Sequence, residues 1–181
     1  MQTLEDSMLR KTILSAAMLL ARNEVEENAD SHKEEAFTMT VDGINHPNYH
    51  AMIVKEEDNG HDFFSILAYQ GEFISQSQLP CVWLSVNADG EGTYAIQQRL
   101  NLEGAWALYN DAEGTGFNFF SSDPKRNKGF VSTCGAITIS SIDQQSRRIS
   151  GRFQFNATNA KGKTKKISEG TFSNLSYFEQ H

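Results

Sequence analysis

The chain has 181 residues, of which 39% are hydrophobic and 22% are charged; these proportions are typical of a soluble globular domain with a sizeable core. Its formal net charge of −7 argues against nucleic-acid binding, because that function needs a basic surface to displace counterions. The two cysteines, Cys81 and Cys134, are too few for a structural zinc site. They either pair in an exported protein or fill apolar space in a reducing compartment.

Residues 1–35 differ in composition from the rest of the chain. Arg10 and Lys11 precede an uncharged apolar run at 12–21, and an acidic stretch follows at 23–35. This order is typical of a secretory signal. As a helix the run would span only about 15 Å, about half of a bilayer core, so a transmembrane anchor is not expected. The alternative interpretation is one amphipathic structural helix over residues 4–27.

From residue 36 onward, the pattern predicts short strands separated by turns. Phe37–Val41 alternates apolar and polar residues and runs into Asp42–Gly43, a dipeptide typical of hairpin turns. Further strands are predicted, in chain order, over residues 49–54, 63–69, 81–86, 92–96, 105–109 and 116–120. We therefore divide the chain into the N-terminal segment 1–35 and a single all-β domain over 36–181.

The C-terminal third has the clearest periodicity. Ile137 and Ile139 share one face of a predicted strand, and residues 149–157 keep a period of two, as in a half-buried antiparallel strand. The last strand is expected over 164–177, with a bulge near Glu169–Gly170. Turn signals at this spacing predict an antiparallel β-sandwich or barrel of about 8–10 strands, preceded by one N-terminal helix.

The order of these strand and turn motifs resembles an uncharacterised domain family of Bacteroidetes envelope lipoproteins. The motifs that carry the resemblance are Phe37–Gly43, Gly92–Tyr94, Gly135–Ile139, Ile149–Phe155 and Glu169–Phe172. In that family a signal and a lipobox precede an acidic spacer and one all-β domain, so the resemblance implies an envelope location. It implies no active site, because the family's biochemical role is not established.

The N-terminal run ends in a sequence that resembles a lipobox. Leu19–Ala21 matches the family pattern, but Arg22 stands where the lipid-bearing cysteine is expected. The thiol that would be acylated is therefore missing from this chain.

Histidines and an aspartate supply the weak metal-ligand candidates, namely His46, His50, His61 and Asp62. A zinc site needs three or four such ligands to converge on one point. Ordinary loop histidines are the favoured interpretation, so we predict no metal and no cofactor.

Catalytic motifs are missing from the sequence. It contains no Gly-x-Ser-x-Gly motif and no glycine-rich phosphate loop before a helix. Its acidic residues fall mainly at predicted turns, where solvation and turn geometry explain them. We expect no enzyme activity.

Adjacent aromatic residues supply the candidate contact surface. Phe119 and Phe120 point to opposite sides of an extended strand. If one of these sides is solvent, the exposed ring marks a contact surface, to which Tyr109 could belong. Core filling on both faces is the favoured interpretation.

The sequence favours a non-catalytic binding or interaction domain, exported to the cell envelope, periplasm or cell surface. Its expected partner is an unidentified protein or glycan, with peripheral membrane association through the N-terminal segment. The alternatives are a carrier that holds a small apolar ligand in a barrel cavity and a soluble immunity or inhibitor protein. A cytoplasmic location is expected instead if the N-terminal segment is a structural helix.

Overall fold

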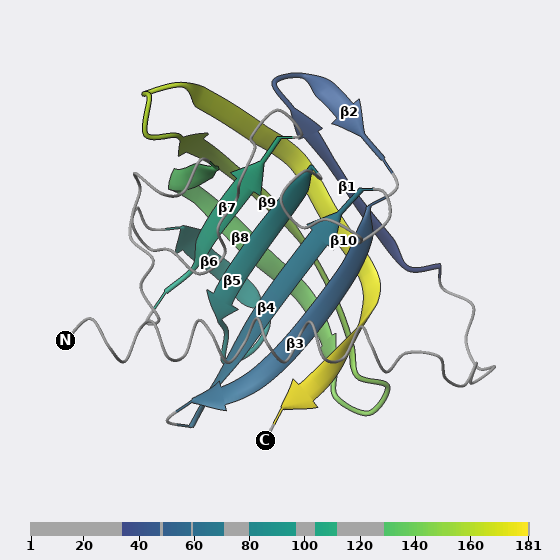
Figure 1. Cartoon of the computed structure of the whole chain (residues 1–181). Helices are drawn as coiled ribbons and strands as arrows, with labels where there is room; N and C mark the ends of the chain where they lie inside the picture. Colours follow the sequence, from purple (N-terminus) through teal and green to yellow (C-terminus); the bar gives the residue numbers. More distant parts are fainter. Residues whose placement is uncertain are drawn as a thin grey trace.

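β-strands make up the regular structure of the computed structural model, which describes residues 34–47, 49–58, 60–70, 80–96, 104–111 and 129–180 (Figure 1). Its ten strands are β1 (Ala36–Val41), β2 (Ile44–His46), β3 (His50–Asp58), β4 (His61–Tyr69), β5 (Cys81–Asn87), β6 (Gly92–Ile96), β7 (Trp106–Asn110), β8 (Phe130–Asp143), β9 (Arg148–Thr158) and β10 (Thr164–Gln180). The predicted all-β class is confirmed. The predicted N-terminal helix and the predicted strand at 116–120 lie outside the described residues. The described residues contain no helix that is long and apolar enough to cross a membrane.

A closed barrel forms the centre of the fold. Seven strands follow one another around it in the order β3, β4, β5, β7, β8, β9 and β10, and β10 returns to β3. Neighbours are antiparallel except for β10 and β3, which run parallel from the Tyr177–Ile53 pair to the Gln180–Glu56 pair. A ring with an odd number of strands cannot alternate direction throughout. The expectation of a wholly antiparallel arrangement is therefore corrected at this seam.

Two long strands each carry two partners on the same side. β10 pairs with β1 near its start and with β3 near its end, and β2 continues the sheet beyond β1 (Figure 1). In the same way, β8 pairs first with β7 and then with β6. The first five residues of β8, from Phe130 to Cys134, were not predicted as strand, because polar and small residues there carry little of the period-two signal.

Inward-facing side chains fill the barrel as one cluster. Ile53, Ile66 and Leu84 lie in register across β3, β4 and β5, and each is 0% exposed. On the opposite wall, Ile149 and Phe153 of β9 are buried as the period of two predicted. A narrow barrel of this kind is normally filled by its own side chains.

The predicted turn and bulge are both present. Asp42 and Gly43 have φ angles of 51° and 82°, as a hairpin turn with two left-handed residues requires. In β10 the register with β9 shifts between Ile167 and Gly170, and Glu169 has a φ of 52°. This bulge changes the direction in which Glu169 points, which matters for the surface described below.

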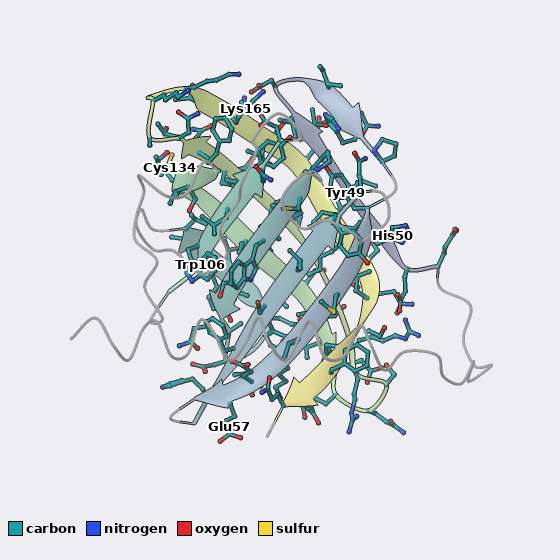
Figure 2. All side chains as sticks on the ribbon, viewed as in Figure 1. Tyr49, His50, Glu57, Trp106, Cys134 and Lys165 are labelled. Atoms are coloured by element: carbon teal, nitrogen blue, oxygen red, sulfur yellow. The ribbon has the colours of Figure 1, made fainter. Side chains whose placement is uncertain are left out.

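A second apolar cluster lies on the outer side of the barrel wall. It comprises Cys81, Trp83, Trp106 and Leu108, with Leu67, Tyr69 and Val131 packed against it; we call this surface the tryptophan face (Figure 2). Trp83 and Leu108 pair across β5 and β7, one position away from the inward row of Leu84 and Ala107. The two tryptophans are therefore buried in this second cluster and not in the barrel interior.

Candidate functional site

A groove of about 550 Å³ crosses β6, β8, β9 and β10 on the outer surface of the barrel. Its walls are polar and its floor is apolar. The wall residues are Thr93, Thr138, Arg152, Gln154, Glu169 and Thr171, and the floor residues are Ala136, Phe153 and Gly170. In these strands, successive side chains point alternately into the barrel and outward. The outward side chains line the groove and can contact a ligand.

Cross-strand register places the first row of wall residues. One residue from each of five neighbouring strands lies in this row. They are Thr93 of β6, Thr138 of β8, Arg152 of β9, Thr171 of β10 and Thr38 of β1. The Oγ1 atoms of Thr93 and Thr138 are 3.0 Å apart, and those of Thr38 and Thr171 are 2.9 Å apart. These hydrogen bonds fix the hydroxyl groups on either side of the arginine.

The bulge in β10 places the second row. Gln154 of β9 pairs with Ala136 of β8, and Glu169 projects outward from the bulge beside it. The hydroxyl of Thr40 donates a hydrogen bond to Glu169 Oε2 at 3.0 Å, which orients the carboxylate. Without the extra residue of the bulge, position 169 would follow the regular alternation of the strand.

Small residues make the hollow. Gly170 has no side chain, and a Cβ atom built there would lie 2.5 Å from two ring carbons of Phe153. The missing side chain makes room for the Phe153 ring, which belongs to the barrel core and is 3% exposed. The small side chain of Ala136 and the Gly170 backbone form the part of the floor that a ligand could meet.

The walls offer both charges and several neutral groups. Arg152 is exposed, and within the described part of the chain its guanidinium has no hydrogen-bond or ion-pair partner. Glu169 supplies a carboxylate, Gln154 an amide and three threonines their hydroxyls. The guanidinium donates hydrogen bonds, the carboxylate accepts them, and the amide and hydroxyl groups do both. A ligand with many hydroxyl groups can pair with all of them.

These wall residues were not predicted as a site. They come from three consecutive strands, β8, β9 and β10, and from the more distant β6, so no contiguous motif contains them. The available signal was parity: Thr138, Arg152 and Gln154 occupy the polar positions of strands whose other positions are apolar. The register between strands determines which of these polar residues lie side by side on the surface.

The four candidate metal ligands are not brought together. His50 pairs with Tyr69 at one end of the β3–β4 hairpin and His61 pairs with Asp58 at the other. Eight residues of extended strand separate these ends by about 26 Å, as the positions of His50 and Glu57 in Figure 2 illustrate. His46 lies on β2, outside the barrel ring. Across the described ranges, no group of three or more histidine, cysteine, aspartate or glutamate residues could hold a metal ion.

Local polar contacts engage two of these candidates. His61 Nδ1 lies 2.9 Å from Asp89 Oδ1 on the surface. Asp62 Oδ2 lies 3.0 Å from Lys55 Nζ, and Lys55 is also 3.9 Å from Glu179. Asp62 thus pairs with a lysine of the neighbouring strand β3 that also faces β10 across the seam.

The proposed aromatic contact surface has one member in the described structure. Tyr109 is 3% exposed, and its ring packs 6.1 Å from that of Phe130. Burial raises the pKa of its hydroxyl. Tyr109 therefore faces the barrel interior and contributes no exposed ring, while Phe119 and Phe120 lie outside the described residues.

Neither cysteine forms a disulfide. Cys81 is buried on the tryptophan face, and burial raises the pKa of its thiol to about 12. Cys134 is exposed, and its sulfur accepts a hydrogen bond from Asn156 Nδ2 at 3.6 Å. Of the two alternatives left open by the sequence, pairing is therefore not what the structure has: both cysteines are free.

Comparison with known proteins gives the family. A model described as a domain of unknown function, DUF6252, matches residues 74–176, more than half of the chain. The chain belongs to the DUF6252 family. The DUF6252 match contains β5 to β9 and most of β10, and with them every residue that lines the groove. No curated protein and no solved structure matches the chain.

Proposed function

We propose that this protein is a non-catalytic binding domain that holds a hydroxyl-rich ligand of the glycan class in the groove. The observation that supports this is the convergence of a guanidinium, a carboxylate, an amide and three hydroxyl groups on an apolar floor. Small-molecule sites typically combine a concave apolar surface with a few placed polar groups. Planar groups such as those of Arg152, Gln154 and Glu169 match pairs of neighbouring hydroxyls.

The charge balance of the groove favours a neutral ligand. Arg152 and Glu169 carry opposite charges in the same groove. An anionic ligand that bound Arg152 would be repelled by Glu169, whereas hydroxyl groups can donate to the carboxylate and accept from the guanidinium.

The chemistry of the lining supports binding without catalysis. The described residues that line the groove include no histidine and no cysteine, the side chains most often used as base or nucleophile near neutral pH. The one carboxylate, Glu169, accepts a hydrogen bond from Thr40 and not from a nucleophilic group placed for attack.

We also propose that the domain acts in the cell envelope. The basic start, short apolar run and acidic spacer of residues 1–35 support this, together with the order of strand motifs shared with envelope lipoproteins. Fractionation of cells that express the native gene tests the location. Protein found only in the cytosol would contradict it.

A carrier of a small apolar molecule is the second candidate, because a closed barrel is compatible with it. It ranks lower because Phe64, Ile137 and Phe172, which are each 0% exposed, occupy interior positions that a ligand would need.

A glycan array probed with the purified full-length protein tests the leading proposal. For a glycan found in this way, Arg152→Ala should weaken binding about tenfold or more, because a hydrogen bond to a charged group contributes about 1.5–3 kcal/mol. Ala136→Phe should abolish binding by filling the floor.

Matched controls lie outside the groove. Arg147→Ala removes an exposed arginine from a turn, and Ala160→Phe adds a ring at an exposed turn position; both should leave the affinity unchanged. The proposal fails if the wild-type protein binds no glycan, or if Arg152→Ala and Ala136→Phe both bind like the wild type.

A further inference from the structure

The groove is longer across the strands than along them. It takes its lining from four neighbouring strands, β6, β8, β9 and β10, but from a stretch of at most three residues on each. Neighbouring strands lie about 4.8 Å apart, and successive outward side chains of one strand lie about 7 Å apart. The groove is therefore about 14 Å long across the strands and about 7 Å wide along them.

The polar surface continues from the groove onto β1, which lies beside the first half of β10 (Figure 1). In the first row, Thr38 of β1 pairs with Thr171, and their hydroxyl oxygens are 2.9 Å apart. In the second row, Thr40 of β1 donates a hydrogen bond to Glu169 and pairs with the exposed Asn45 of β2. The first row thus extends over five strands, a distance of about 19 Å.

Hydrogen-bonding groups repeat along this first row. Arg152 lies at its centre, between the hydroxyl pair of Thr93 and Thr138 and the hydroxyl pair of Thr171 and Thr38. Within each pair one hydroxyl donates to the other, so the pair keeps one free donor and several acceptor lone pairs. The same neutral pattern therefore occurs on both sides of the guanidinium. A ligand whose hydroxyl groups repeat in the same way matches this row better than a compact ligand does.

A sugar chain has such a repeat. One pyranose ring covers about one strand spacing, about 4.8 Å, so a single sugar reaches the side chains of only two neighbouring strands. Five strands have four such spacings between them, so an unbranched chain of about four units covers the whole row. Arg152 is the one charged residue of the row. A chain with a charge on every unit would leave most of its charges without a partner, which favours a neutral chain.

We propose that the groove and the adjoining hydroxyl pair of Thr38 and Thr171 together bind a neutral, unbranched oligosaccharide of about four units, which lies across the strands. This inference rests on the proposed glycan-binding function. It adds the size and the direction of the ligand, and it adds Thr38, which does not line the groove.

The dependence of affinity on chain length tests the size of the ligand. Isothermal titration calorimetry of the full-length protein is carried out with cello-, xylo-, manno- and malto-oligosaccharides of one to six units. For a series that binds, the affinity should rise with each added unit up to about four units and then level off. Each added unit that gains one neutral hydrogen bond should tighten binding about two- to tenfold. This measurement uses the wild-type protein, so it does not depend on the folding of any variant.

Thr38→Val tests the contribution of β1. Valine keeps the branched shape of threonine and removes the hydroxyl group. The affinity for the four-unit chain should fall about two- to tenfold, and the rise of affinity with length should end at about three units. Thr164→Val is the matched control, because it removes an exposed threonine hydroxyl at the start of β10, outside both rows. This control should reproduce the wild-type dependence on length.

The outcomes separate this inference from the function on which it rests. A wild-type affinity that levels off at one or two units overturns the inference and leaves glycan binding in the groove intact. A folded Thr38→Val variant with the wild-type dependence on length also overturns it. If the protein binds no saccharide of any series and none on the glycan array, the proposed function fails and the inference fails with it.

Discussion

Gly170 makes room for the Phe153 ring in the barrel core. Its position directly over the ring leaves no room for a side chain, since a Cβ atom would lie 2.5 Å from two ring carbons. This residue therefore determines how the core packs beneath the groove.

Replacing Gly170 by alanine should therefore destabilise the protein through overpacking. We expect Gly170→Ala to lower the free energy of unfolding by about 1–3 kcal/mol, the usual range for an added group in a packed site. Urea denaturation measures it. Gly90→Ala is the control, because a Cβ atom there would meet nothing within 4 Å. Equal midpoints for the two variants would show that Phe153 moves aside without loss.

At the scale of elements, Asp42 attaches the β1–β2 hairpin to the start of β10. Asp42 Oδ1 accepts a hydrogen bond from the Lys166 backbone N–H at 2.9 Å, and Oδ2 lies 2.8 Å from Lys165 Nζ. The hydrogen bond from the Lys165 side chain, and then that from the Lys166 backbone, lower the pKa of Asp42 below its ordinary 3.8. The turn residue is also a link between strands.

This lowered pKa predicts a pH-dependent contribution. A carboxylate whose pKa falls on folding stabilises the native state above the unfolded-state value, and the contribution is lost as pH falls through the folded-state value. Asp42→Asn keeps the turn and an acceptor oxygen but removes the charge. At pH 7 we expect a loss of at most about 1 kcal/mol, because the pair is partly exposed. Urea denaturation at about pH 2 should show a smaller loss than at pH 7. A loss of equal size at both pH values would contradict the ionic explanation.

The sequence predicted individual strands better than it predicted which strands pair with one another. The period of two in β9 depends on neighbouring residues alone, so it was visible in the sequence, as was the parity change that marks the β10 bulge. The inner and outer faces of β5 could not be told apart, because a strand buried on both faces shows no alternation. The groove was missed because its walls are joined only by the register between strands. The pattern of a single strand does not encode that register.

At the scale of the whole molecule, the parallel seam between β10 and β3 closes the ring. Tyr177 lies in this seam at 2% exposure, and its ring meets that of Phe64 edge-on at 5.5 Å. Two residues later, Glu179 lies 3.9 Å from Lys55 and 3.5 Å from Arg147. The last few residues of the chain therefore join the first strand of the barrel to its last.

Removal of residues 177–181 should open the barrel. The loss of the buried Tyr177 ring alone is worth about 3–5 kcal/mol, as for other large aromatic residues, and β3 would gain an unpaired edge. We expect a large fall in the thermal midpoint or loss of the cooperative transition. Deletion of His181 alone is the length control and should have no effect. Tyr177→Phe separates packing from hydrogen bonding. In the described part of the chain, the Tyr177 hydroxyl is buried without a hydrogen-bond partner, so its removal should be neutral or stabilising. A truncated protein that unfolds at the wild-type midpoint would mean that the barrel is held closed without this seam.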